Sequence, residues 1–461
     1  MPLSLSSLSR LRVGVVLVGA LSVLQPLSAS SASARGNAPS WSTYHGDSLG
    51  QGVIPAASVS LHSPRWVSPP LDGDLYGQPV ADGNRILVAT ENNTFYALSA
   101  SSGRILWRRH VAQAVPASDL ACGDIAPTVG ITGTPVVDLA RHEVFAVAFE
   151  KRGPRDLHVL VGVSTLSGAV EASYPVDPAG VDPRYLLQRT GLSLDQGHVI
   201  FGFGGNSGDC GPYRGRVVSV SENGESTTFF TIDAAAGQRE GAVWMGGGAP
   251  VIDGRGNIWV ESGNGSVTST SAPYDRSDAV LELSPSLHLL QYFAPNDWTS
   301  QNAADLDLSA SPIVTRSGAV LAVGKAGTAY LLSASHLGGI GGDLTHLSAC
   351  PGTMDGGSAV VNTVAYLPCM GGVVAVQFSF HPARLRELWS SGQGGSSPVV
   401  TSAQVLSLSG DGTLVALSRT TGHLEESYRL PGLANHFPTV GYAANELLVD
   451  ATRTVYAFST H

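Results

Sequence analysis

The chain has 461 residues and a net charge of −10, and only 13% of its residues are charged. Binding to nucleic acid needs clustered Lys and Arg, so this acidic composition argues against a nucleic-acid partner. The length is sufficient for two domains or for one large repeat architecture.

Residues 1–34 are predicted to be a signal peptide. Arg10 and Arg12 precede the apolar run VGVVLVGALSVLQPL, and the small residues Ala32, Ser33 and Ala34 fit a signal-peptidase site. The run is shorter than the about 20 residues that a membrane span needs, although an uncleaved anchor remains the alternative. We therefore expect a secreted or extracytoplasmic protein of the cell envelope, without stable membrane insertion after signal cleavage. Residues 35–60 would form an N-terminal extension.

Residues 61–461 contain a repeated unit of short strands separated by turns rich in Gly, Asn, Asp and Ser. Clear copies begin GQPVADGNRILVAT, GTPVVDLARHEVFAVAF, GGAPVIDGRGNIWVESGN, SASPIVTRSGAVLAVGKAG and SSPVVTSAQVLSLSGDG. Weaker copies start near Thr190 and Ser358, and the last reads FPTVGYAANELLVDATRTVYAFS. Eight copies spaced roughly 40 to 60 residues apart, built on a unit of four strands, predict a β-propeller.

The final copy has only three strands, and the segment LHSPRWVSPP (residues 61–70) is predicted to supply the fourth. Pairing of this segment with the last blade would close the ring and hide sheet edges that an open array exposes. The predicted fold is therefore all-β, an eight-bladed propeller of four-stranded antiparallel blades.

Four cysteines in an exported chain favour two disulfides, for which three pairings exist. We favour Cys350 with Cys369, because these residues flank one strand–turn–strand unit. Cys122 and Cys210 would then join two long loops, CGDIAP and GDCGPYRG. The sequence contains no CxxC motif that would suggest a zinc ribbon or an attached haem.

The segment ALSASSGRILW (residues 97–107) resembles the blade motif of the PQQ-like repeat propellers, the quinoprotein alcohol dehydrogenase-like family. Ala97, Gly103 and Trp107 match the motif, whereas Ser99 and Ser102 replace its Asp and Thr. At the level of blades the resemblance covers essentially the whole mature chain. It implies that Trp107 docks on the next blade.

Dehydrogenases of this family hold pyrroloquinoline quinone (PQQ) and Ca²⁺ at the centre of one face. The resemblance nominates Asn264, in ESGNGS, as a cofactor-binding metal ligand, and Asp305, in QNAADLDLSASP, as metal ligand and catalytic base with Asp307 as its neighbour. Lys325, in VGKAGTAYLL, matches the cation that faces the quinone oxygens.

Two departures weaken the resemblance to a dehydrogenase. The stretch that carries the family's metal-binding Glu reads SGDCGPYRG, which offers only Asp209 as a calcium ligand, out of register. Gly247 stands where the family has the Trp that forms the floor of the quinone site, and Trp244 is misplaced for this role.

The nominated residues also have ordinary structural interpretations. Asn264-Gly and Lys325-Ala-Gly are typical of hairpin turns, and Asp305 and Asp307 could cap loop amides. We therefore favour a non-enzymatic binding or scaffold module that recognises a protein or envelope partner on one propeller face, with no cofactor. The alternative is a PQQ- and Ca²⁺-dependent alcohol or sugar dehydrogenase with a reduced active site. Convergence of Asn264, Asp305 and Lys325 on the ring axis, with room for a flat ligand, would favour the alternative.

Overall fold

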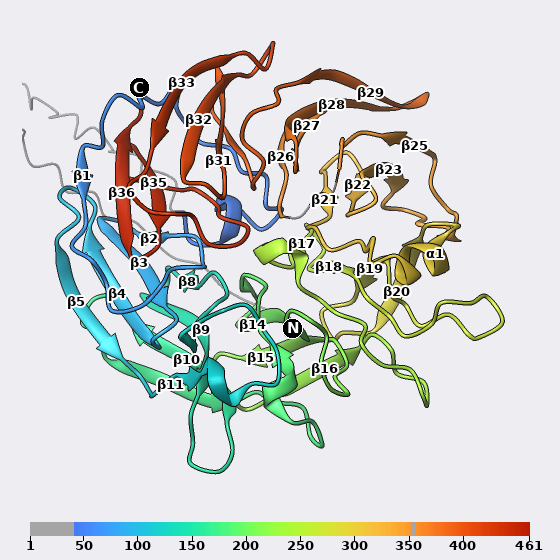
Figure 1. The fold of residues 1–461 in the computed structure, drawn as a ribbon, viewed down its shortest axis with the longest axis horizontal. Helices are drawn as coiled ribbons and strands as arrows, with labels where there is room; N and C mark the ends of the chain where they lie inside the picture. Colours follow the sequence, from blue (N-terminus) through green and yellow to red (C-terminus); the bar gives the residue numbers. More distant parts are fainter. Residues whose placement is uncertain (1–40, 353, 355) are drawn as a thin grey trace, which may run out of the picture. The chain divides into compact units, whose positions relative to one another are not determined.

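Eight antiparallel sheets follow one another around a ring (Figure 1). The computed structural model describes residues 41–352, 354 and 356–461, and each of the eight sheets within them has four or five strands. The predicted eight-bladed all-β propeller is therefore confirmed. The predicted signal peptide, residues 1–34, lies outside the described residues. Among the described residues, no helix is both long and apolar enough to cross a membrane.

The first four blades each begin with a short strand at the ring axis and proceed outward. Blade 1 contains β2 (Val80–Asp82), β3 (Arg85–Thr90), β4 (Thr94–Ser99) and β5 (Ile105–His110). Blade 2 contains β8 (Val136–Asp138), β9 (Glu143–Glu150), β10 (Leu157–Ser164) and β11 (Val170–Pro175). Blade 3 contains β13 (Ser193–Asp195), β14 (His198–Gly205), β15 (Arg216–Ser221) and β16 (Thr227–Thr231), and β12 (Leu186–Leu187) also pairs with β14. Blade 4 contains β17 (Val251–Ile252), β18 (Ile258–Ser262), β19 (Ala279–Leu283) and β20 (Leu289–Ala294), with β24 (Gly339–Ile340) parallel to β20.

The remaining blades repeat this order. Blade 5 contains β21 (Ile313–Val314), β22 (Ala319–Val323), β23 (Thr328–Ser333) and β25 (Thr345–Ser348). Blade 6 contains β26 (Ala359–Val361), β27 (Val364–Cys369), β28 (Gly372–Phe380) and β29 (Ala383–Ser390). Blade 7 contains β30 (Val399–Val400), β31 (Gln404–Leu408), β32 (Thr413–Ser418) and β33 (Leu424–Arg429). Blade 8 contains β34 (Gly441–Ala443), β35 (Glu446–Ala451), β36 (Thr454–Ser459) and β1 (Trp66–Val67).

Blade 8 is built from both ends of the propeller, as the sequence predicts. In the ladder between β1 and β36, Trp66 lies opposite Ala457 and Val67 lies opposite Tyr456. The N-terminal strand thus supplies the outer strand of the last blade. The pairing removes the open edge that β36 would otherwise present to solvent.

The hydrophobic core is divided among the interfaces between neighbouring blades. At the closure of the ring, for example, Val88 and Leu98 of blade 1 pack with Leu448 and Val455 of blade 8. One such apolar cluster fills each of the other seven interfaces. The middle strands are buried on both faces, which explains why they have continuous apolar sequences instead of alternating ones.

Aromatic residues on outer strands fasten each of several blades to the next. Trp107 of β5 donates its indole N–H to the carbonyl of Thr165 in blade 2 at 2.9 Å, which confirms the docking that the motif implies. A Cβ on Gly168 would lie only 2.9 Å from the Trp107 ring, so the motif glycine provides the flat surface on which the indole lies. Equivalent indole hydrogen bonds join Trp66 to Ala100 and Trp389 to Arg419.

The segment of residues 41–61, here called the strap, lines the inner edges of the blades. Its 3₁₀ helix η1 (Tyr44–Gly46) lies inside the ring (Figure 1). Backbone carbonyls of the strap accept hydrogen bonds from inner strands of five blades: Trp41 from Ala81, Ser42 from Val137, Ser48 from Ile252, Gln51 from Val360, and Gly52 from Val400. Because these blades lie on different sides of the ring, the strap crosses its axis.

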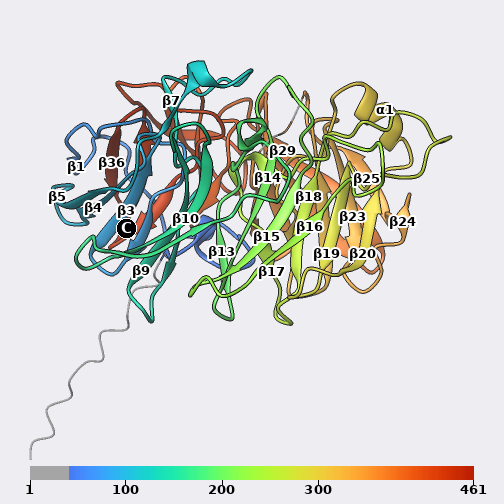
Figure 2. The same ribbon diagram turned by 90° about the horizontal axis from the view of Figure 1, so that it is seen from below.

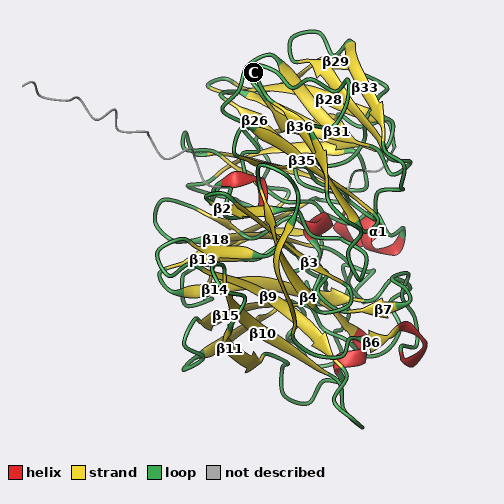
Figure 3. Cartoon of the chain, turned by 90° about the vertical axis from the view of Figure 1, so that its left-hand side faces the viewer, coloured by secondary structure: helices red, strands yellow, loops and turns green. Residues whose placement is uncertain are grey.

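The few helices are short and lie in connections between strands. Figures 2 and 3 show α1 (Trp298–Ala303) and β7 (Thr128–Val129) at the same face of the ring. β7 pairs with β6 (Val115–Pro116), and η2 (Ala117–Asp119) follows β6 directly. The remaining 3₁₀ helices are η3 (Pro183–Tyr185) and η4 (Met245–Gly247). Together these connections build the surroundings of a cavity at the axis.

Candidate functional site

A cavity of about 330 Å³ lies at the ring axis, and three of the predicted site residues line it: Asp209, Asp305 and Lys325. The other charged or aromatic residues of its wall are Tyr76, Asp124, Arg189, Trp244, His436 and Phe437. Most of these residues precede the inner strands, whereas the backbone carbonyls of the strap bind the inner strands themselves. The Tyr44 side chain of the strap also reaches residues before inner strands, because its hydroxyl accepts from the backbone N–H of Gly357 at 3.2 Å. None of the described residues that line the cavity belongs to the strap.

Lys325 follows β22 and is bonded to two carboxylates. Its Nζ donates to Asp305 Oδ1 and to Asp307 Oδ2, each at 2.8 Å. The Asp307 side chain is fully buried, whereas that of Asp305 is 73% exposed. Burial alone would lower the pKa of Lys325, but the two carboxylates outweigh it and raise this pKa above the ordinary value. The ammonium group is therefore charged at neutral pH and is compensated by the protein itself.

Asp209 and Asn264 meet through a residue that the sequence analysis missed. The hydroxyl of Tyr213 donates to Asp209 Oδ1 at 2.6 Å and accepts from Asn264 Nδ2 at 3.2 Å. Burial raises the pKa of Tyr213, so the phenol keeps its proton. Asp209 and Asn264 both have φ of +48°, which agrees with the interpretation of Asn264 as a turn residue. Asn264 is not among the residues that line the cavity.

Trp244 lines the cavity although the motif spacing excluded it as a floor residue. It directly precedes η4, and its indole N–H donates to the carbonyl of Gly205 at 2.8 Å. Gly247, which stands at the motif position, lies against Arg189: a Cβ there would be 2.5 Å from Nη1. An indole wall is therefore present, but it comes from a neighbouring position in the sequence.

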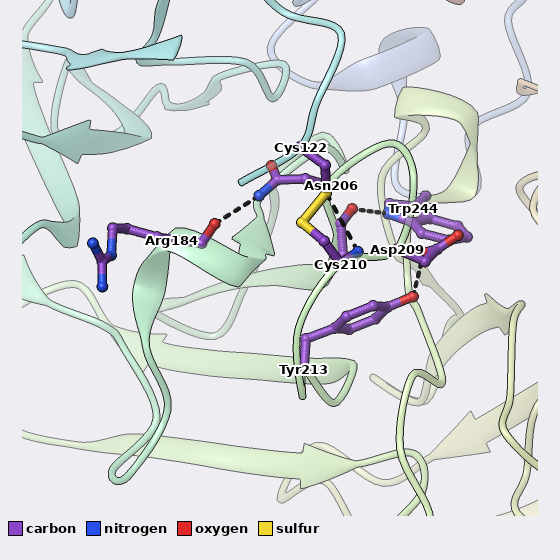
Figure 4. The surroundings of a disulfide bond; sticks show 8 residues. Cys122, Arg184, Asn206, Asp209, Cys210, Tyr213 and Trp244 are labelled. Carbon is purple, nitrogen blue, oxygen red and sulfur yellow. Dashed lines mark hydrogen bonds between the residues drawn. A yellow bond between two sulfur atoms is a disulfide. The ribbon is translucent and has the colours of Figure 1, made fainter. Parts of the chain in front are cut away.

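The disulfide between Cys122 and Cys210 joins two loops at the rim of the cavity (Figure 4). One loop carries Asp124 and the other carries Asp209, and both aspartates line the cavity. The backbone N–H of Cys210 also donates to the sulfur of Cys122 at 3.3 Å. The second disulfide joins Cys350 to Cys369, at the end of β27. The structure thus contains both disulfides in the pairing that the sequence favours.

Arg189, between β12 and β13, is the second site residue that the sequence analysis missed. It is only 4% exposed, and its guanidinium lies 5.8 Å from the ring centre of Tyr76 and 5.7 Å from that of Phe437. Its Nη2 donates to the carbonyl of His436 at 2.7 Å. Cation–π contacts of this kind hold a guanidinium in place without neutralising its charge.

Burial lowers the pKa of Arg189, and the two carboxylates whose charges oppose this shift, Glu91 and Asp124, are bonded to other groups. Glu91 accepts from the backbone N–H of Gly130 at 2.6 Å, and burial raises the pKa of Glu91 to about 7. Asp124 lies 3.0 Å from the imidazole of His436. No hydrogen bond from Arg189 to a carboxylate occurs in the described part of the chain. Arg189 is therefore a buried cation that faces a cavity without a bonded counter-ion.

The calcium site that the resemblance implies can be tested on these contacts. Ca²⁺ takes six to eight oxygen ligands. Lys325 already binds Asp305 and Asp307, while Tyr213 binds Asp209 and Asn264. The described residues contain no group of three or more His, Cys, Asp or Glu side chains arranged to hold a metal ion. The arrangement therefore does not fit a calcium site, because Lys325 and Tyr213 donate to carboxylate oxygens of Asp305, Asp307 and Asp209 that the ion would need.

Comparison with known proteins places the chain among propellers of this type. A family model, PQQ_2, described as outer membrane protein assembly factor BamB, matches residues 41–284, more than half of the chain. No curated protein sequence matches this chain significantly.

Solved structures with the same fold include both enzymes and an assembly factor. Quinohemoprotein alcohol dehydrogenase ADHIIG from Pseudomonas putida HK5 has a TM-score of 0.67 at 12% identity, covering 92% of this chain and 80% of that one. A europium-containing methanol dehydrogenase has a TM-score of 0.66 at 12% identity, covering 92% and 98%. BamB from Moraxella catarrhalis has a TM-score of 0.57 at 15% identity, covering 87% and 100%. At these identities the likeness shows the fold alone.

Proposed function

The chain belongs to the PQQ_2 propeller family, whose model is described as outer membrane protein assembly factor BamB, and we propose that it is a non-enzymatic binding or scaffold propeller of the cell envelope. The loops around the axial cavity would form the recognition face for a protein or another envelope component. Loops carried on a rigid sheet scaffold are where recognition residues concentrate.

One observation carries this proposal: the groups that would perform quinone chemistry are bonded to one another. A catalytic base must reach the substrate proton with a free, ionised carboxylate. Asp305 instead shares Lys325 with the buried Asp307. A cation that stabilises a reduced quinone must likewise direct its N–H donors at the quinone oxygens, and two of the three N–H donors of Lys325 already point to carboxylates.

Two disulfides support a location outside the cytoplasm, because such bonds persist in oxidising compartments. The predicted signal peptide agrees with this location. We therefore propose export through the signal peptide, followed by work in the envelope or outside the cell.

The second candidate function is the PQQ- and Ca²⁺-dependent alcohol or sugar dehydrogenase. The placement of Asp209, Asp305, Lys325 and Trp244 around one axial cavity favours it. Under this candidate Asp305 would be the base, Lys325 would face the quinone, and Asp209 and Asn264 would contribute metal ligands.

The deciding experiment is a titration of the purified mature chain with PQQ, with and without Ca²⁺, in which tryptophan fluorescence reports binding. Trp244 lies in the cavity wall and would report an aromatic ligand bound there. We expect no saturable quenching at tens of micromolar PQQ. Saturable, Ca²⁺-dependent quenching that Lys325→Ala weakens would overturn the proposal and establish the quinoprotein candidate.

A further inference from the structure

The charges of the axial cavity are distributed unevenly around its wall. The cation Lys325 is compensated by Asp305 and Asp307, whereas Arg189 has no bonded carboxylate among the residues that the structure describes. A buried guanidinium is costly unless an anionic group or several acceptors satisfy its fork of N–H donors. The structure shows one acceptor, the carbonyl of His436. Arg189 is therefore prepared to bind the carboxylate of a ligand.

The same cavity also presents carboxylates. One carboxylate oxygen of Asp305 accepts from Lys325, and the Asp305 side chain is 73% exposed. One carboxylate oxygen of Asp209 accepts from Tyr213, and Asp209 lies on the disulfide-bonded rim. A cationic group of a ligand in the cavity would meet these two carboxylates. Figure 4 shows Asp209 beside the disulfide, with its hydrogen bond to Tyr213.

Apolar and aromatic side chains form the rest of the wall. Tyr76 and Phe437 flank Arg189, and Trp244, Ile125 and Leu187 also line the cavity. Ligand pockets combine such apolar walls with a few polar groups that fix the orientation of the ligand. A ligand with an apolar body and two opposite charges would match this composition.

We propose that the axial cavity binds a free amino acid with an aromatic or large apolar side chain. Arg189 holds the α-carboxylate in a charge-assisted, two-point contact. Asp305 holds the α-ammonium in the cavity that Asp209 also lines, and the aromatic wall contacts the side chain. The inference rests on the proposed function, since it assigns to the cavity a recognition role instead of a quinone.

The charge balance favours a zwitterion over a simple ion. A purely anionic ligand would bring its charge close to Asp124, Asp209 and Asp305, which line the same wall. A purely cationic ligand would leave Arg189 buried without a partner. A zwitterion satisfies both ends and adds no net charge to the cavity.

The test is calorimetric titration of the whole mature chain with L-phenylalanine and two matched analogues. 3-Phenylpropionate lacks the ammonium group, and phenethylamine lacks the carboxylate. We expect saturable binding of L-phenylalanine, with each analogue about tenfold weaker or more, since each loses one charge-assisted contact. Equal binding of 3-phenylpropionate would overturn the inference in favour of an anion site. Absence of binding at millimolar L-phenylalanine would overturn it as well.

Two variants locate the ligand. Arg189→Gln is expected to weaken the binding of L-phenylalanine about tenfold and to leave the binding of phenethylamine unchanged. Asp305→Asn is also expected to weaken the binding of L-phenylalanine about tenfold, but to leave the binding of 3-phenylpropionate unchanged. Asp305 is exposed, so its variant should fold even if Arg189→Gln does not. The matched control is Arg429→Gln on blade 7, an exposed residue that pairs with Asp411. If the control weakens binding as much as Arg189→Gln does, the assignment of the site is wrong.

The outcomes separate this inference from the proposed function. Binding of PQQ with Ca²⁺ would overturn the proposed function, whatever L-phenylalanine does. Failure of both PQQ and L-phenylalanine to bind would overturn the inference and leave the scaffold function standing.

Discussion

The strap and the wall of the axial cavity connect the same blades by different means. The strap offers backbone carbonyls to five blades and buries Trp41, Tyr44 and His45. In the cavity wall, loops place charged side chains such as Arg189 and Lys325 around an open space. We therefore expect substitutions in the strap to act on stability, and under the proposed function we expect recognition to depend on the cavity wall.

The largest effect is expected from the disulfide at the cavity rim. Replacing Cys122 and Cys210 by Ala opens a loop of 88 residues and should lower the free energy of unfolding by about 4–5 kcal/mol in the chain-entropy model. The matched pair Cys350 and Cys369 closes only 19 residues and should contribute about 3 kcal/mol. Unfolding in guanidinium chloride measures the loss of unfolding free energy for both pairs. A larger loss from the shorter loop would show that native contacts, and not loop length, set the order.

Trp41→Ala tests whether the strap stabilises the ring. Trp41 is 4% exposed and packs with the core between blades 7 and 8, while its indole N–H donates to Gln78. Removing a buried indole should lower the free energy of unfolding by about 3–5 kcal/mol. Leu433→Ala, at a side chain that is 62% exposed, is the control and should change it by less than about 0.5 kcal/mol. Similar effects of the two substitutions would contradict the role of the strap.

Lys325→Met tests, within the cavity wall, how much the buried partner Asp307 and the exposed partner Asp305 each depend on the cation. It leaves the buried Asp307 without its cation and should lower the free energy of unfolding by about 3 kcal/mol. Asp305→Asn removes only the exposed partner and should change it by less than about 1 kcal/mol. Addition of Asp307→Asn to Lys325→Met should recover part of the loss. If it recovers nothing, the buried charge is not the cause.

The smallest effect is a pH dependence that originates in the strap. Burial lowers the pKa of His45 to about 4, below the ordinary value of 6.5, and its side chain is 1% exposed. The unfolded chain therefore binds more protons between these pH values, and the contribution of His45 to stability is lost as pH falls from about 6.5 towards 4.

At pH 5 this loss amounts to about 2 kcal/mol. His45→Asn suits the positive φ of this position and removes the titration. The difference in unfolding free energy between the two proteins, measured from pH 7.5 to 5, isolates the histidine from carboxyls that titrate in the opposite sense. These include Asp450, whose pKa burial raises to about 7. A constant difference across this range would disprove the assignment.

The blades could be predicted from sequence because each one repeats the same local pattern. Even the weak copies were placed within a few residues: β13 begins at Ser193 and β26 at Ala359. The strap, in contrast, was interpreted only as an extension. Its contacts use backbone carbonyls, which every residue has, so residues 41–61 carry no periodic signal that would reveal them.

The candidate site was predicted in part. The resemblance to the PQQ-like family nominated Asp305 and Lys325, and the structure places both in the cavity wall. Tyr213 and Arg189 lie in irregular loops, where no period fixes the direction of a side chain. The available signal was Arg189 in QRTGLSLD, a cation in the connection that leads into the inner strand β13. Its significance depends on the aromatic rings of Tyr76 and Phe437, which are far away in the sequence.

The pairing of β1 with β36 also has a consequence for biogenesis. Blade 8 cannot form until the last strands have emerged, so β1 must wait unpaired while the intervening blades are made. Contacts between residues so distant in sequence form slowly, and an unpaired edge strand is prone to wrong partners in the meantime. A chain that crosses a membrane with its N-terminus first would spend this interval exposed on the far side. If this chain is exported as proposed, its yield in the cell is expected to depend on factors that hold unfolded chains on the far side of the membrane, and not only on the stability of the finished ring.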